Sequence, residues 1–154
     1  MTQAKFLRLA LPLQHKHRLR TTKMYKSTKS ETVIYPELSY KIVGCLFEVF
    51  RNLGANHRER YYQEAVKKEL AEIKLNFQEQ VYIPLDYKND KIGKYFLDFL
   101  IEDKIVLELK KDSIFHKQNI EQVLAYLKST NLKLGIIANF TRDGVRFYRV
   151  LNIR

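Results

Sequence analysis

Residues 96–111 read FLDFLIEDKIVLELKK, and this stretch decides how the middle of the chain folds. Two apolar runs of strand length flank the polar residues 102–104, a pattern typical of a β-hairpin. Each run carries one carboxylate, Asp98 in the first and Glu108 in the second. Burying a lone ionised carboxylate is costly, so both acids need a partner, a metal or a role in chemistry.

The register of this hairpin decides which charged side chains meet. If residues 102–104 form a three-residue loop, Asp98 falls opposite Glu108, and opposed residues share a face of the sheet. Lys110 then points to the same side, because residues two apart on a strand share a face. A two-residue loop would instead pair Asp98 with Leu107 and turn Glu108 to the other face.

Two carboxylates and a lysine at one point favour a site for a hard divalent cation. Neighbouring anions repel each other and raise a pKa unless a cation lies between them, and Mg²⁺ takes oxygen ligands. Such a cation lowers the pKa of a water and polarises a phosphodiester oxygen, while Lys110 orients the water or stabilises charge on the phosphate. The alternative is a solvated acid pair with a salt bridge to Lys110, worth at most about 1 kcal/mol.

The bulk composition indicates one globular domain with a basic leading segment. The 154 residues are 45% hydrophobic and 29% charged, with a net charge of +11. Residues 1–30 hold eight basic side chains and no acid, which leaves about +3 for residues 31–154. We expect a disordered basic arm at 1–30 and one domain at 31–154. The alternatives for the arm are a transit peptide or a natural start at Met24.

The lone Cys45 allows no intramolecular disulfide, and no apolar run approaches the length of a membrane span. Both features favour a cytoplasmic protein without membrane contact. The four histidines lack a ligand spacing, so no zinc site is expected.

Periodicity and turn signals predict the order of helices and strands. The expected elements are helices at 36–53 and 57–73, strands at 77–87, 96–101 and 105–111, a helix at 113–129, and strands at 132–140 and 145–151. Pro84 places the first strand at a sheet edge or a bulge. The order ααβββαββ predicts an α/β fold whose mixed central sheet contains an antiparallel hairpin and is flanked by helices.

Asp98 followed by Glu108-Leu109-Lys110 resembles the core of the restriction-endonuclease-like, or PD-(D/E)xK, nuclease superfamily. More closely, the chain resembles the bacterial GxxExxY proteins of that superfamily. The colinear segments that carry this resemblance are GANHRERYY at 54–62, QVYIPLDY at 80–87, QVLAYL at 122–127, LGIIANF at 134–140, and the turn Asp143-Gly144 with Arg146. The resemblance spans about residues 35–151 and implies a restriction-endonuclease-like core.

The resemblance also implies roles for individual residues. Asp98 and Glu108 would bind Mg²⁺, with Mn²⁺ as a substitute and the Leu109 carbonyl as an extra ligand. Lys110 would serve the water or the phosphate. Glu59 would be a further ligand of the metal or of its water; the alternative is a first-turn acid that complements the helix dipole. The implied activity is phosphodiester hydrolysis on nucleic acid, with DNA favoured.

The helix at 113–129 offers two further candidates. Gln122 and Tyr126 lie on a stripe distinct from the apolar one, because four residues advance only about 40° around a helix. Gln122 would contact a phosphate or a water on the metal, and Tyr126 a sugar or base; the alternative is that both cap the sheet edge. Two departures from the family concern Asn56, which replaces a glycine but tolerates a left-handed conformation, and Asn119, which replaces a histidine common in relatives.

Two other functions fit the same pattern. One is a nucleic-acid-binding or protein-interaction module that keeps the fold without useful turnover, and the other is a metal-dependent enzyme acting on a small phosphate ester. Small nucleases of this type often pair to cut two strands, so the resemblance is compatible with a homodimer. The basic arm would add sequence-independent, salt-dependent affinity for nucleic acid.

Overall fold

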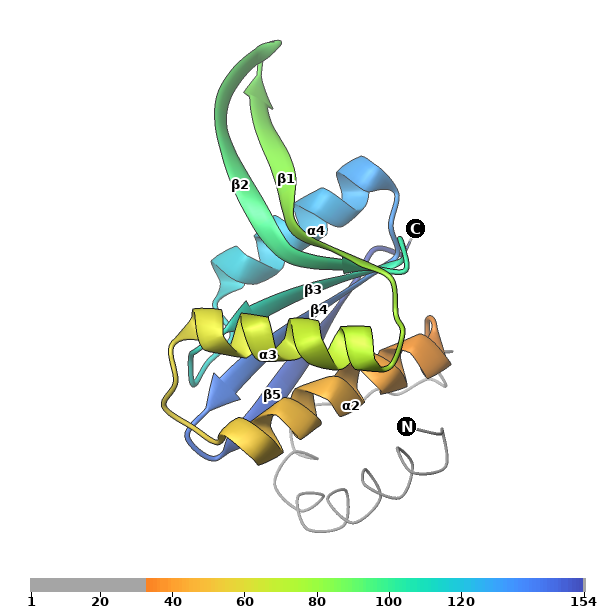
Figure 1. The fold of residues 1–154 in the computed structure, drawn as a ribbon. Helices are drawn as coiled ribbons and strands as arrows, with labels where there is room; N and C mark the ends of the chain where they lie inside the picture. Colours follow the sequence, from red (N-terminus) through yellow and green to blue (C-terminus); the bar gives the residue numbers. More distant parts are fainter. Residues whose placement is uncertain (1–32, 154) are drawn as a thin grey trace, which may run out of the picture.

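The computed structural model describes residues 33–153, which fold into three helices and five strands (Figure 1). The basic arm expected at residues 1–30 lies outside the described residues. In chain order the elements are α2 Pro36–Leu53, α3 Glu59–Glu72, β1 Phe77–Tyr87, β2 Asp90–Ile101, β3 Ile105–Lys110, α4 Lys117–Thr130, β4 Leu134–Thr141 and β5 Gly144–Leu151. The expected order ααβββαββ is therefore confirmed.

Strand β2 is longer than the sequence predicted. It begins at Asp90, whereas the apolar run indicated a strand only from Phe96. The preceding turn at Lys88 and Asn89 has left-handed φ values of 49° and 72°, which are typical of a two-residue hairpin turn. Because this turn matches the twist of the flanking strands, β1 and β2 stay paired up to the turn.

Helix α4 begins later than expected, at Lys117 instead of Ser113. The Asp112 carboxylate accepts a hydrogen bond from the Ser113 N–H at 2.7 Å and also contacts the His116 ring. An aspartate that bonds the backbone just after itself favours a turn over a helix. Asp112 therefore holds the preceding segment outside the helix.

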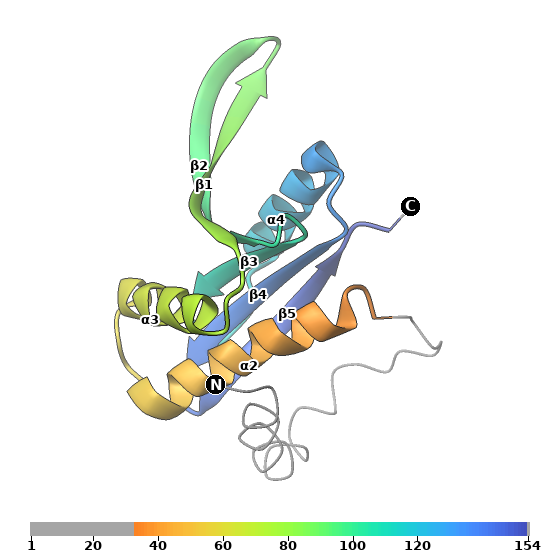
Figure 2. The same cartoon turned by 45° about the vertical axis from the view of Figure 1, so that its right-hand side comes forward.

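The strands form one mixed sheet in the order β1-β2-β3-β4-β5. Strands β3 and β4 pair in parallel through the α4 connection, and the other neighbours are antiparallel. Ile101 pairs with Ile105, so residues 102–104 form the three-residue loop and the expected register is confirmed. Helices α2 and α3 cover one face of the sheet, and α4 covers the other (Figures 1 and 2).

Each face of the sheet has its own apolar core. Leu107 of β3 belongs to the core under α2 and α3 together with Ile42, while Val106 belongs to the core under α4 together with Leu127. Cys45 is fully buried in the first core, and burial raises the pKa of its thiol to about 12, so it is a packed thiol. None of the described helices is both long and apolar enough to cross a membrane.

The β1–β2 hairpin extends beyond the sheet as a curved two-stranded ribbon (Figures 1 and 2). Strand β2 pairs with β3 only over residues 99–101, whereas its pairing with β1 continues to the turn. We call residues 81–97 the ribbon. Pro84 lies in β1, an edge strand, and a register shift follows between Leu85 and Asp86, as the proline predicted.

Candidate active site

The two acids of the opening stretch lie where β2 separates from β3. The Asp98 main-chain N–H donates to Glu108 Oε2 at 3.2 Å, and the Leu109 N–H donates to Asp98 Oδ2 at 2.7 Å. The last main-chain pair between β2 and β3 is Phe99 with Leu107, so pairing ends just before the two acids. The carboxylates thus satisfy backbone donors that the departing strand leaves without a ladder partner, and both are only 6% exposed.

Burial and mutual repulsion control the charge of this pair. Burial, followed by the negative charge of Glu108, raises the pKa of Asp98 from 3.8 to about 7, although the Leu109 N–H and Lys110 act in the opposite direction. Burial alone would lower the pKa of Lys110, but its hydrogen bond to Glu108 and the surrounding acids raise it. Lys110 is therefore charged, and a second cation at the pair would relieve the repulsion that favours a protonated Asp98.

Lys110 connects the acid pair to helix α3. Its Nζ lies 2.8 Å from Glu108 Oε1 and 3.8 Å from Glu59 Oε1. The other oxygen of Glu59 accepts a hydrogen bond from the Lys111 N–H at 3.2 Å. Glu59 is the first residue of α3, so the start of this helix is held against the end of β3. The structure thus brings the four expected charged residues together.

One residue of this site was missed by the sequence reasoning. Gln63 Nε2 donates to Asp98 Oδ1 at 2.8 Å, so both carboxylate oxygens of Asp98 carry a hydrogen bond. Gln63 follows Glu59 by four residues, and residues at this spacing share one face of a helix. That spacing is the signal that would have identified it once Glu59 was placed at the site.

The loop between α2 and α3 fixes where Glu59 lies. The Tyr62 hydroxyl donates to the Gly54 carbonyl at 2.8 Å, and its ring stacks on Phe140 with centroids 4.1 Å apart. Asn56 adopts φ 67°, which confirms that it takes the left-handed conformation for which a glycine is usual. The Tyr62 contacts therefore tie the first turn of α3 to β4.

Helix α4 presents its two candidate residues differently. Gln122 is half-buried, whereas Tyr126 is 8% exposed and belongs to the core under α4 with Val123 and Leu127. Tyr126 was expected on a separate stripe, and that expectation is wrong. The reason is that Tyr126 shares this core with Ile83 and Leu97 from the base of the ribbon, so the buried face of α4 is wider than its apolar stripe. Burial also raises the pKa of the Tyr126 hydroxyl.

The oxygen ligands at the junction suit a hard divalent cation. Asp98 and Glu108 supply two buried carboxylates whose repulsion is visible in the raised pKa of Asp98. Within residues 33–153, however, no group of three or more acids, histidines and cysteines is arranged to hold a metal. A cation held by the pair would complete its shell with a carbonyl, waters or substrate oxygens, which is how Mg²⁺ is usually bound.

A buried amide lies beside this junction. Asn139 of β4 pairs with Lys110 of β3, and its side chain is 1% exposed. Its Nδ2 donates to the Ile114 carbonyl at 2.6 Å, but its Oδ1 has no hydrogen-bond donor among the described residues. A buried acceptor in this state requires a physical explanation. This acceptor lies on the strand next to β3, level with Lys110 in the register.

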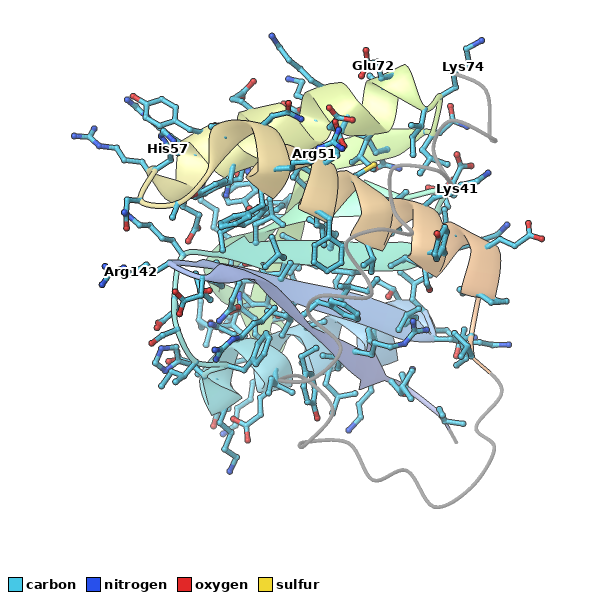
Figure 3. The ribbon with its side chains drawn as sticks, turned by 90° about the horizontal axis from the view of Figure 1, so that it is seen from below. Lys41, Arg51, His57, Glu72, Lys74 and Arg142 are labelled. Atoms are coloured by element: carbon cyan, nitrogen blue, oxygen red, sulfur yellow. The ribbon has the colours of Figure 1, made fainter. Side chains whose placement is uncertain are left out.

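An open pocket of about 220 Å³ lies at the same end of the molecule. It is formed by the α2–α3 loop, the segment after β3 and the β4–β5 turn, and its lining residues are Asn56, Lys111, Asp112, Ser113, Phe140, Thr141 and Arg142. Figure 3 shows His57 and Arg142 projecting at this end, away from Lys74. The pocket therefore continues the surface that begins at Lys110 and Glu59.

A family model described as the PD-(D/E)XK nuclease superfamily matches residues 36–150. No curated protein gives a significant match. Among solved structures, one described as "Crystal structure of SSO0001" is similar, with a TM-score of 0.44, 16% sequence identity, and coverage of 77% of this chain and 79% of that chain.

Proposed function

The chain belongs to the PD-(D/E)XK nuclease superfamily, and from this premise we propose that it hydrolyses phosphodiester bonds in nucleic acid, with DNA as the favoured substrate. One observation carries the proposal. Asp98 and Glu108 are buried side by side at the point where β2 leaves the sheet, and Lys110 is ion-paired to Glu108 at 2.8 Å. The segment GANHRERYY at 54–62 supports the narrower assignment to the GxxExxY proteins.

Asp98 and Glu108, with the Leu109 carbonyl, would hold Mg²⁺, for which Mn²⁺ would substitute. Nucleases of this superfamily generally use divalent metal ions. When bound, such an ion would lower the pKa of a water and polarise a phosphodiester oxygen. The raised pKa of Asp98 supports this assignment, because a cation replaces the proton that the acid pair otherwise retains.

The chain's own residues supply the remaining functions. Lys110 is held between Glu108 and Glu59, which keeps its ammonium charged beside the acid pair. There it would orient the attacking water or stabilise charge that develops on the phosphate while water adds to phosphorus and one P–O bond breaks. Gln63 would fix the carboxylate plane of Asp98. Glu59 would contribute as a further ligand or through its contact with Lys110.

Other parts of the chain would bind the substrate. Gln122 would contact a phosphate, whereas the burial of Tyr126 limits it to supporting the junction from the α4 side. We further propose that residues 31–154 form the nuclease domain and that the basic residues of 1–30 add salt-dependent affinity. A homodimer acting on two strands and a cytoplasmic location fit this function.

A nuclease assay tests the proposal directly. Single- and double-stranded DNA and RNA would be incubated with Mg²⁺, Mn²⁺ or EDTA, using wild type, Asp98→Ala and Lys110→Ala. Glu72→Ala is the matched control, because Glu72 is exposed at the far end of α3 (Figure 3). We expect metal-dependent cutting that falls at least about a hundredfold in the first two variants and is unchanged in the control. Equal cutting by all four folded proteins would reject it.

A second function is a nucleic-acid-binding or interaction module without turnover. It is favoured by the complete hydrogen bonding of the acid pair, in which Gln63, Lys110 and two backbone N–H groups already satisfy the four carboxylate oxygens. Calorimetry with Mg²⁺ and Mn²⁺ separates the two functions. A nuclease binds the ion through Asp98 and Glu108, whereas the module shows no ion binding and no cutting on any substrate.

A further inference from the structure

The ribbon has two different faces over the same residues. Its inward side chains pack with the core under α4, and they are Val81, Ile83, Tyr95 and Leu97. Its outward side chains are exposed, and they are Tyr82, Pro84, Lys94 and Phe96. The register pairs Tyr82 with Phe96 and Pro84 with Lys94, so these four side chains lie together on one face.

The outward face carries an exposed aromatic pair with a cation beside it. The rings of Tyr82 and Phe96 are 5.8 Å apart at an interplanar angle of 64°, and the two side chains are 47% and 44% exposed. The Lys94 ammonium lies 5.9 Å from the centre of the Phe96 ring. At the tip, Lys88 lies 5.3 Å from the centre of the Tyr87 ring. Each cation is within the range of an attraction to an aromatic face.

This face lies close to the candidate active site along one strand. Phe96 precedes Asp98 by two residues, which is about 7 Å of extended strand. A DNA strand advances about 3.4 Å per nucleotide in a duplex, and somewhat more when unstacked. The aromatic pair would therefore meet bases only one or two nucleotides from a phosphate held at Asp98 and Glu108.

We propose that Tyr82, Phe96 and Lys94 form a stacking platform for the bases of a single nucleic-acid strand next to the bond that is cut. Bases stack on exposed aromatic side chains irrespective of sequence, and a neighbouring lysine neutralises the adjacent phosphate. This inference rests on the proposed function, because it names the form of substrate that the site would take. It implies a preference for single-stranded or locally opened nucleic acid over closed duplex.

A second copy of the chain is the competing occupant of the ribbon. The tip exposes Leu85 and Ile92, at 45% and 61%, which would suit a protein interface. The outward face near the body differs from the tip, because its two aromatic rings contact each other and lie two residues along β2 from Asp98. A self-association surface does not need the acid pair nearby, whereas a substrate strand would use the paired rings beside the bond that is cut.

Binding measured without cutting tests the platform. Fluorescence anisotropy in EDTA would compare a short labelled single-stranded oligodeoxynucleotide with its duplex, using wild type, the double variant Tyr82→Ala/Phe96→Ala, and Lys94→Ala. Phe147→Ala is the matched control, because Phe147 is 40% exposed on β5 at the opposite edge of the sheet. We expect about tenfold weaker single-strand binding for the double variant, a smaller loss for Lys94→Ala, and no change for the control.

The outcomes separate this inference from the proposed function. If wild type cuts nucleic acid and the folded double variant binds and cuts equally well, the platform is rejected and the nuclease function stands. If the double variant loses binding while no protein cuts any substrate, the platform is supported and the nuclease function fails. Sedimentation gives the third outcome. If wild type is a dimer, the double variant is a monomer and its affinity for the single-stranded oligonucleotide is unchanged, the ribbon is a protein interface and the platform is rejected.

Discussion

The two halves of β2 belong to one strand but have opposite surroundings. Residues 99–101 pair with β1 on one side and β3 on the other, and they lie within the cores. Residues 90–96 pair with β1 alone and are mostly exposed, although they also contain large apolar side chains. Asp98 stands at the boundary. Burial along this strand therefore depends more on having a paired strand on both sides than on residue type.

The boundary between the halves explains why the acids are there. When β2 leaves β3, the backbone N–H groups of Asp98 in β2 and Leu109 in β3 lose their ladder partners, and a buried donor without an acceptor is costly. The Leu109 N–H donates instead to the Asp98 carboxylate, and the Asp98 N–H donates to the Glu108 carboxylate. Where the two strands separate, Lys110 of β3 and Gln63 of α3 also reach the acids. The charged site therefore forms at the point where β2 leaves β3.

The largest expected contrast is between the stability contributions of the two regions. Leu107 pairs with Phe99 in the doubly paired region and is fully buried, so Leu107→Ala should reduce the free energy of unfolding by about 2–5 kcal/mol. Tyr87 lies at the ribbon tip and is 59% exposed, so Tyr87→Ala should change it by less than about 0.5 kcal/mol. Urea unfolding measures both. Similar losses in the two variants would show that the ribbon folds as part of the core.

The next expected effect is a pH dependence that originates at the boundary. The pKa of Asp98 is about 7 in the folded chain, raised from 3.8 by burial and then by Glu108. Between these two values the folded chain keeps a proton that the unfolded chain has lost, so the free energy of unfolding decreases as pH rises. In EDTA we expect a decrease of about 2–4 kcal/mol between about pH 4 and pH 7, and no further loss from this group above pH 7.

Asp98→Asn isolates that contribution, because it keeps the shape of the side chain and removes the titration. The variant should lack this decrease, so its stability relative to wild type should rise between about pH 4 and pH 7 in EDTA, although it loses activity. Added Mg²⁺ should stabilise wild type and leave the variant unchanged. A constant stability difference between the two proteins across the whole pH range would contradict the assignment.

A smaller effect is expected at Gln63, which reaches the boundary from α3. Gln63→Leu removes the donor to Asp98 Oδ1 and should lower kcat about tenfold, with little change in KM, because the carboxylate loses its fixed orientation. The control is Gln78→Leu, since Gln78 makes a comparable bond to Asp103 on the exposed edge of the sheet. A loss of activity in the control as large as in Gln63→Leu would show that the effect is not specific to the site.

Local signals predicted more of the molecule than signals that depend on tertiary contacts. The three-residue loop fixed the register that places Asp98 beside Glu108, and the left-handed Asn56 followed from its residue type, because both depend on a few adjacent residues. The length of the ribbon depends on where β3 stops pairing, which no run of residues encodes alone. Tyr126 was misplaced because it shares a core with residues of the ribbon, and Gln63 was missed because its partner comes from a distant strand.

The smallest expected effect tests whether α3 is held to the body through its first turn. Tyr62 is 1% exposed, and its hydroxyl donates to the Gly54 carbonyl at 2.8 Å, so Tyr62→Phe should lower the free energy of unfolding by about 1 kcal/mol. Tyr61→Phe is the matched control, because its hydroxyl is bonded to Arg60 on the exposed side of the same helix. Since the hydroxyl of Tyr62 fixes the loop that precedes Glu59, its removal should also reduce turnover by a few-fold, while the control keeps both quantities. Unchanged stability and turnover in Tyr62→Phe would mean that stacking on Phe140 alone positions this helix, and that the junction of β2 and β3 needs no support from the loop.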